Sequence, residues 1–172
     1  AKVICITNQE GGVGKTTTAV NLAYFLAKDK FSTLILDFDR QGNASSGLGI
    51  DKSTLVGSMT EVILGQMPLS KIIIHTQYKN LDVAPTTPQL ANAEVELTKL
   101  TKKFIQLKSA IAEVADKYEY IMTYSFPCQD LSVCGLGRGM QKGSGTRSGL
   151  LWEVERILCE LAERESLPQI LV

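Results

Sequence analysis

The stretch GGVGKTT, residues 11–17, combines residue types that can hold phosphate groups. Its three glycines let backbone amides point inward without obstruction, and the Lys15 ammonium can bridge two phosphates. The Thr16 hydroxyl can bind magnesium, and Thr17 can donate a further hydrogen bond. The spacing differs from the common phosphate-loop pattern, because Gln9 stands where that pattern has a glycine. The expected nucleotide-binding residues are Gly11, Gly12, Val13, Gly14, Lys15, Thr16 and Thr17.

Such a loop needs a strand before it and a helix after it, and the flanking residues predict both. KVICIT (2–7) is a short β-branched run that is typical of a buried strand, and a helical pattern begins at Lys15. The amino end of a helix carries a partial positive charge that favours phosphate. The alternative is a glycine-rich turn without a ligand, but a buried strand, three glycines, a lysine and paired threonines rarely coincide by accident.

The rest of the chain predicts further strands and helices in alternation. Strands are expected at 32–38, 78–86, 118–126 and 169–172, helices at 55–64, 90–114 and 149–165, and a loop at 41–49. The segment 90–114 fits one amphipathic helix of about seven turns, which either lies on a sheet or forms a coiled-coil seam. We expect an α/β fold of three layers with a mostly parallel sheet. His75, the only histidine, is expected at a strand edge.

Composition limits the partners and the location that we expect. The 172 residues include 18 Lys and Arg and 18 Asp and Glu, so nothing attracts the whole chain to nucleic acid or membrane. The four cysteines lack metal-ligand spacing, which favours a reduced protein without disulfides. The sequence contains neither a signal peptide nor an apolar run that could span a bilayer. We therefore expect a cytoplasmic protein with no membrane partner.

Three stretches resemble one family. NQEGGVGKTTTAVNLAYFLA (8–27), LILDFDRQGNASSGLGI (34–50) and NLDVAPTTPQLANAEVEL (80–97) are similar to the ParA/MinD group of deviant P-loop ATPases, in its Soj-like branch for chromosome and plasmid partitioning. The resemblance covers about residues 1–121. It implies a P-loop NTPase-like, Rossmann-like fold that binds ATP or ADP with Mg²⁺.

The resemblance also implies roles and partners. Asp39 would position the attacking water and support the magnesium shell, together with Thr16, and Lys15 would be the second catalytic residue. Asp37 belongs to the same acidic strand end. Members of this family act in DNA segregation through nucleotide-controlled self-association, so the resemblance implies a homodimer that contacts DNA and a partition-complex protein.

Three residues depart from the family pattern. Glu10 stands at the signature lysine, which reaches across a nucleotide-sandwich dimer. A carboxylate there turns attraction into repulsion, and two unit charges about 4 Å apart interact by roughly 4 kcal/mol at a dielectric constant of about 20. Arg40 replaces a common proline, and Tyr124 stands where a Walker B aspartate belongs. We predict that nucleotide still binds, that dimerisation is weakened and that hydrolysis is weak or absent.

From about Met122 a second resemblance begins. Residues 123–160 are similar to the catalytic-loop region of cytosine-5 DNA methyltransferases, whose nucleophile motif Pro-Cys-Gln is matched around Cys128. In that chemistry the thiolate attacks carbon 6 of a flipped-out cytosine. The methyl-donor site of those enzymes is missing, because the first strand leads into a phosphate loop.

Together the two resemblances predict a chimera. We expect one P-loop NTPase-like domain over residues 1–172, in which a ParA-like part (1–121) is joined to a methyltransferase-like segment (122–172) that completes a sheet truncated at its C-terminus. The alternatives are a methyltransferase fragment with Cys128 as its nucleophile and a non-catalytic remnant.

Overall fold

The computed structural model describes residues 1–8, 12–39, 41–90, 103–124, 170 and 171. These residues form a six-stranded sheet with the strand order β3-β4-β2-β5-β1-β6. Neighbouring strands run parallel except β3 and β4, which are antiparallel. The strands are β1 (Lys2–Ile6), β2 (Thr33–Asp37), β3 (Ile74–His75), β4 (Leu81–Ala84), β5 (Tyr120–Tyr124) and β6 (Ile170–Leu171). The predicted mostly parallel sheet is confirmed.

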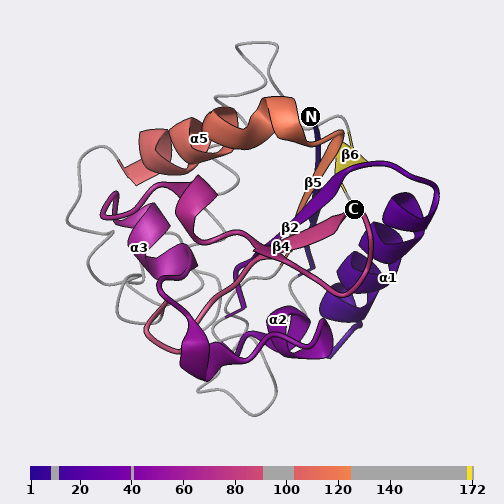
Figure 1. Ribbon diagram of the computed structural model, residues 1–172, viewed down its shortest axis with the longest axis horizontal. Helices are drawn as coiled ribbons and strands as arrows, with labels where there is room; N and C mark the ends of the chain where they lie inside the picture. The colour runs from indigo at the N-terminus through magenta and orange to yellow at the C-terminus, as the bar shows by residue number, and fades with distance from the viewer. Residues whose placement is uncertain (9–11, 40, 91–102, 125–169, 172) are drawn as a thin grey trace.

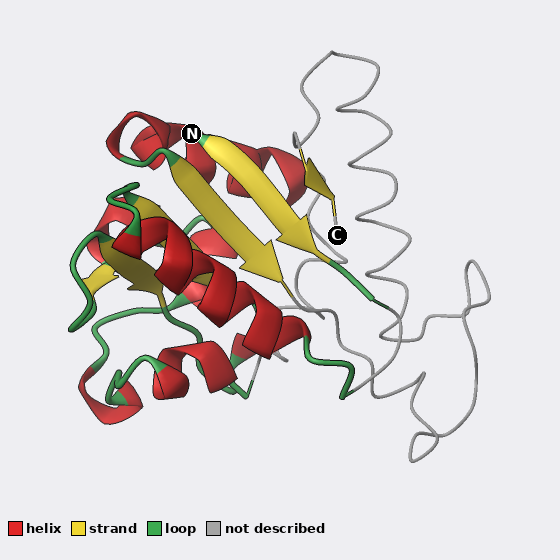
Figure 2. Ribbon diagram, turned by 90° about the vertical axis from the view of Figure 1, so that its right-hand side faces the viewer, coloured by secondary structure: helices red, strands yellow, loops and turns green. Residues whose placement is uncertain are grey.

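Helices cover both faces of this sheet, which gives the three expected layers. Figure 1 shows α1 and α2 on one side and α3 and α5 on the other, and Figure 2 shows α1 in front of the strands. Short 3₁₀ helices complete the described connections. The helices are α1 (Lys15–Lys28), α2 (Asn43–Gly47), α3 (Met59–Ile63) and α5 (Lys103–Val114), and the 3₁₀ helices are η1 (Lys52–Thr54), η2 (Leu69–Lys71) and η3 (Ala115–Lys117).

Small side chains let α1 lie close to the sheet. Ala19, Ala23 and Ala27 are buried and repeat every four residues, which places them on one face of the helix. They belong to an apolar cluster that also holds Ile35 of β2 and Met122 of β5. This packing fixes the direction of α1, and therefore the position of its first turn relative to the ends of the strands.

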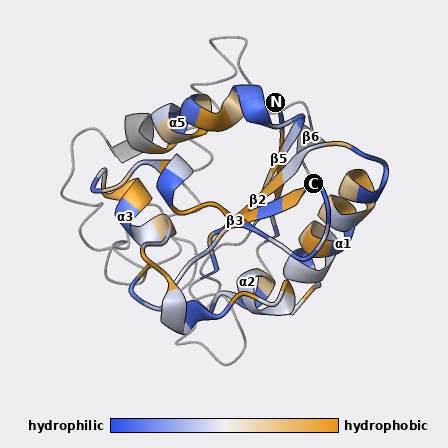
Figure 3. Ribbon diagram, in the orientation of Figure 1, coloured by the Kyte–Doolittle hydropathy of each residue, from blue (hydrophilic) through white to orange (hydrophobic). Residues whose placement is uncertain are grey.

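The opposite face of the sheet is covered by α3 and α5. Leu107 and Val114 of α5 pack into a second cluster with Leu34 and Leu36, two residues of the fully buried strand β2. In its described part, the long periodic segment therefore lies on the sheet, which decides against a coiled-coil seam. Figure 3 shows the corresponding hydrophobic colouring on the strands and on stretches of these helices.

Two expectations about local structure were wrong. The segment 41–49 contains helix α2 and is not only a loop, because Asn43–Gly47 form a helical turn that is anchored to the end of β2. The helix expected at 55–64 begins at Met59, where Ser58 and Glu61 form a reciprocal capping box. That capping signal is present in the sequence and marks the true start. The helix expected at 149–165 lies outside the described residues.

No described helix combines the length and the apolar character that crossing a bilayer requires.

Cys5 on β1 provides a test of burial in the sheet. The side chain is half-buried, and burial raises the pKa of its thiol from the ordinary 9.0 to about 11. Because only the thiolate reacts, this shift lowers the reactive fraction at pH 8 by roughly 100-fold. We expect iodoacetamide to modify Cys5 about 100-fold more slowly in the native chain than in guanidinium, as measured by peptide mass spectrometry. Equal rates in both states would contradict this burial.

Candidate phosphate-binding site

The glycine-rich loop connects β1 to α1 at the carboxyl edge of the sheet. Gly12 and Gly14 have φ angles of 76° and 87°, in the left-handed region that only glycine adopts without strain. Among the described residues, a Cβ built on either glycine would meet no atom within 4 Å. The backbone here is therefore bent in the way a phosphate loop requires, and the described residues leave room beside both glycines.

The amino end of α1 brings together most of the predicted phosphate-binding residues. Gly14 is the N-cap residue, and its carbonyl accepts the first helical hydrogen bond from the Thr18 amide at 2.8 Å. Lys15 and Thr16 are half-buried in the first turn, and Thr17 is exposed beside them. The first amides of a helix have no partners inside it, and the helix dipole adds positive charge there. This end of α1 can therefore attract an anion.

One predicted residue offers only its backbone, and several others lie outside the described residues. Val13 is 45% exposed at the loop, where it can contribute only its backbone to a ligand. Gly11, Glu10 and Arg40 lie outside the described residues, and so does Cys128.

Two carboxylates lie at the carboxyl end of β2, at the same edge of the sheet as the glycine-rich loop after β1. Asp37 is the last residue of β2 and pairs in register with Tyr124 of β5, which in turn pairs with Ile6 at the end of β1. Asp39 lies two residues further on and is half-buried. Because these parallel strands end at the same edge, the acidic residues and the glycine-rich loop share one end of the sheet.

Asp37 is held by four donors. Its Oδ1 accepts hydrogen bonds from the Asp39 amide at 3.1 Å and from the Tyr124 hydroxyl at 2.8 Å. Its Oδ2 accepts the Ser45 amide at 2.9 Å and the Ser45 hydroxyl at 2.6 Å. A carboxylate offers about four lone-pair positions, so these donors fill it. Asp37 therefore ties β2, β5 and α2 together.

Asp39 is less fully occupied by the described residues. Its Oδ1 accepts the Gln41 amide and its Oδ2 accepts the Asn43 side-chain amide, both at 3.0 Å. These two bonds orient the carboxylate from outside the sheet and leave it with acceptor capacity.

Burial and nearby negative charge keep the proton on the Tyr124 hydroxyl. Burial raises the pKa of Asp37, although hydrogen bonds from Ser45, Tyr124 and Asp39 oppose the shift. The pKa of Tyr124 is raised strongly, first by burial and then by the negative charges of Asp37 and Asp39. Tyr124 therefore remains a hydrogen-bond donor throughout the physiological pH range.

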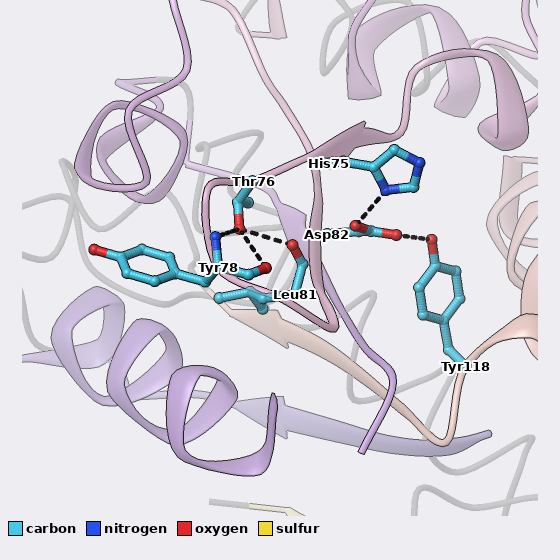
Figure 4. Close-up of polar contacts among 6 residues, drawn as sticks. All are labelled: His75, Thr76, Tyr78, Leu81, Asp82 and Tyr118. Carbon is cyan, nitrogen blue, oxygen red and sulfur yellow. Dashed lines mark hydrogen bonds and ion pairs between the residues drawn. The ribbon is translucent and has the colours of Figure 1, made fainter. Parts of the chain in front are cut away.

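A second polar cluster lies at the opposite end of the sheet. Asp82 accepts a hydrogen bond from the Tyr118 hydroxyl at 2.6 Å, and its other oxygen lies 2.7 Å from Nδ1 of His75 (Figure 4). His75 belongs to the edge strand β3, with a side chain that is 89% exposed, so its predicted place at a strand edge is confirmed. The cluster is too far along the strands to belong to the phosphate-binding end.

Within the described parts of the chain, no group of three or more His, Cys, Asp or Glu side chains could hold a metal ion.

Sequence comparison now decides the family. A family model described as an AAA domain, AAA_31, matches residues 1–134. The chain belongs to this family. Its Lys15 and Asp39 both lie within the matched region.

Curated relatives of this AAA domain include chromosome partitioning proteins. The chain is 45% identical over 121 residues to the chromosome partitioning protein ParA of Myxococcus xanthus, and 46% identical over 121 residues to the sporulation initiation inhibitor protein Soj of Bacillus subtilis. It is 39% identical over 121 residues to the chromosome-partitioning ATPase Soj of Treponema pallidum. Each alignment covers 70% of the chain, but only 43%, 48% and 47% of the relatives. The chain thus spans about half the length of these proteins.

Solved structures agree with the fold. One similar structure is that of cobyrinic acid a,c-diamide synthase from Mycobacterium smegmatis with bound ATP analog and magnesium. The superposition covers 99% of this chain and 72% of the synthase chain, with a TM-score of 0.72 and 24% sequence identity. Another is that of the septum site-determining protein MinD from Pyrococcus horikoshii in complex with Mg-ADP. This superposition covers 71% of this chain and 47% of the MinD chain, with a TM-score of 0.57 and 26% sequence identity. The predicted P-loop NTPase-like fold is confirmed.

Proposed function

We propose that the chain binds ATP or ADP as the nucleotide-binding part of a ParA-type partitioning ATPase. The observation that carries this proposal is the backbone bent into positive φ at Gly12 and Gly14, directly before the amino end of α1, where no described atom lies within 4 Å of a built Cβ. Similarity to partitioning proteins, one of them called an ATPase, and to a MinD structure with Mg-ADP supports the choice of nucleotide.

The residues of this AAA domain take the following roles in the proposal. Amides of residues 11–17 and the Lys15 ammonium bind the phosphates, because the helix end and the lysine supply positive charge. Thr16 and Asp39 fit a magnesium ion that keeps most of its water, since the described residues leave Asp39 acceptor capacity and Mg²⁺ usually takes one or two carboxylates plus phosphates. Bound magnesium would neutralise phosphate charge. Asp39 would orient the attacking water.

We further propose that turnover and self-association are impaired. The Tyr124 hydroxyl is committed to Asp37, and a phenol is a poor substitute for a second metal-supporting carboxylate. Glu10 would oppose the phosphates of a partner subunit in a nucleotide-bridged homodimer. Within the cytoplasm, the expected role is chromosome or plasmid segregation, with DNA and a partition-complex protein as partners.

The chimeric organisation remains part of the proposal. We propose one domain over residues 1–172, in which residues 122–172 complete the sheet that residues 1–121 begin. Support comes from β5, which spans the boundary between the two resemblances and pairs in register with β1 and β2, and from the 121-residue extent of the curated alignments. A methyltransferase fragment with Cys128 as its nucleophile is the alternative reading of the second part.

A thermal-shift titration with ADP, ATP and S-adenosylmethionine tests this function. At a ligand concentration about 100 times the dissociation constant, binding stabilises the native state by about 2.7 kcal/mol. For a chain of this size that corresponds to a rise in melting temperature of roughly 5–10 °C. We expect this rise with ADP or ATP and none with S-adenosylmethionine. A rise with the methyl donor alone would favour the methyltransferase alternative, and no rise with either nucleotide would refute the proposal.

A further inference from the structure

The two carboxylates beside the phosphate loop differ in what they can still bind. The described residues give Asp37 four hydrogen-bond donors and Asp39 two. Because a carboxylate has about four acceptor positions, Asp37 can accept a metal ion or a metal-bound water only by losing a donor. Magnesium at a nucleotide is usually held by one or two carboxylates as well as phosphates. Of these two carboxylates, only Asp39 keeps acceptor positions that the described residues do not fill.

Tyr124 is the donor that decides this difference. Its ring is 1% exposed within the core cluster under α1, so the side chain cannot swing away from Asp37 without opening the core. The pairing of Asp37 with Tyr124 in the sheet register fixes the hydroxyl beside the carboxylate. The hydroxyl donates to Oδ1 of Asp37 at 2.8 Å, the same oxygen that accepts the Asp39 amide.

We propose that Tyr124 makes nucleotide affinity at this site nearly independent of magnesium. The inference rests on the proposed function and deepens it by naming the residue that sets the metal requirement. The Tyr124 hydroxyl occupies the acceptor position on Asp37 that a magnesium-bound water would need. Nucleotide is then held mainly by the loop amides and Lys15, and magnesium contributes only through Thr16, Asp39 and the phosphates themselves.

The test compares ADP dissociation constants, measured by isothermal titration calorimetry in saturating magnesium and in excess EDTA. For the parent chain we expect the two constants to agree within about threefold. Tyr124→Phe keeps the ring in the core and removes only the hydroxyl, which leaves a gap about the size of a water molecule beside Asp37. We expect EDTA to weaken ADP binding to this variant by about tenfold. Tyr124→Asp supplies a further carboxylate, and its metal dependence should be at least as large.

Tyr118→Phe is the matched control. This variant removes the Tyr118 hydroxyl, which donates to Asp82 in an equivalent tyrosine–aspartate hydrogen bond at the other end of the sheet. Its ADP affinity should respond to EDTA as the parent does. Because this comparison uses a ratio of affinities, a general loss of stability in a variant does not imitate the effect.

The remaining outcomes count against the inference. A tenfold or larger loss of ADP affinity by the parent in EDTA would overturn it. So would a folded Tyr124→Phe variant that remains as insensitive to EDTA as the parent. If the parent bound no nucleotide in either buffer, the proposed function itself would fail, and this inference with it.

Discussion

Replacing Lys15 with alanine is expected to weaken ADP binding by about 100-fold without unfolding the chain. Hydrogen bonds between a lysine ammonium and phosphate are charge-assisted and contribute roughly 1.5–3 kcal/mol each. A loss of about 2.7 kcal/mol corresponds to about 100-fold in the dissociation constant. The side chain is half-buried in the first turn of α1, outside the apolar cluster under this helix, so its removal leaves the packing unchanged.

The measurement is a calorimetric titration with ADP, and Lys28→Ala is its control. Lys28 lies in the last turn of the same helix and is exposed. Its replacement therefore also removes one lysine from α1, but about 13 residues away from the loop. We expect Lys28→Ala to bind ADP within about twofold of the parent. Equal affinities for the parent and Lys15→Ala would show that the ammonium does not contact the phosphates.

Replacing Asp37 with asparagine is expected to lower the free energy of unfolding by about 3 kcal/mol. The amides of Asp39 and Ser45 each donate to a different oxygen of Asp37. An asparagine side chain has only one oxygen, so one of these backbone N–H groups would face an amide N–H instead. The hydroxyls of Ser45 and Tyr124 can rotate, but the backbone groups cannot, and a buried unsatisfied donor is costly.

The size of this loss should depend on pH in a defined direction. Burial raises the pKa of Asp37 above its ordinary 3.8, so the native state binds more protons than the unfolded state as pH rises from about 4. The contribution of Asp37 to stability is therefore largest below this window and decreases as pH rises through the raised pKa. The difference between the parent and Asp37→Asn should accordingly be larger near pH 4 than at pH 7.

Urea unfolding at several pH values measures both effects, with Asp82→Asn as the control. Asp82 also accepts a hydrogen bond from a tyrosine, but its partners among the described residues are the side chains of the half-buried Tyr118 and of His75, which can adjust to an amide. We expect its replacement to cost about 1 kcal/mol. If Asp37→Asn cost no more than Asp82→Asn, the four-donor network would not stabilise the fold as described.

Local sequence signals predicted the elements of the site well. The β-branched run before the glycines, the positive φ angles that those glycines adopt, and the helical period after Lys15 are all properties of neighbouring residues. The capping box at Ser58 is equally local, and its motif could have corrected the start of α3.

Contacts between distant residues were not predictable in the same way. Tyr124 stood out in the sequence, but its hydroxyl bonds Asp37, which is 87 residues away, and nothing local to either residue specifies that pair. The same is true of Ser45, whose contacts with Asp37 make a helical turn of a segment that was expected to be a loop. The strand order that creates these contacts depends on which strands pair, and alternation of strands and helices does not determine it.

The position of β5 has a consequence for cooperativity. This strand is hydrogen-bonded on both sides, to β1 and to β2, and the boundary between the two sequence resemblances falls within it. We expect its amide protons to exchange with solvent only when the middle of the sheet opens, so β5 should be among the slowest-exchanging of the described strands. The proposed boundary between the two resemblances therefore lies inside a strand that is paired on both sides, and we expect limited proteolysis of the native chain not to cut it there.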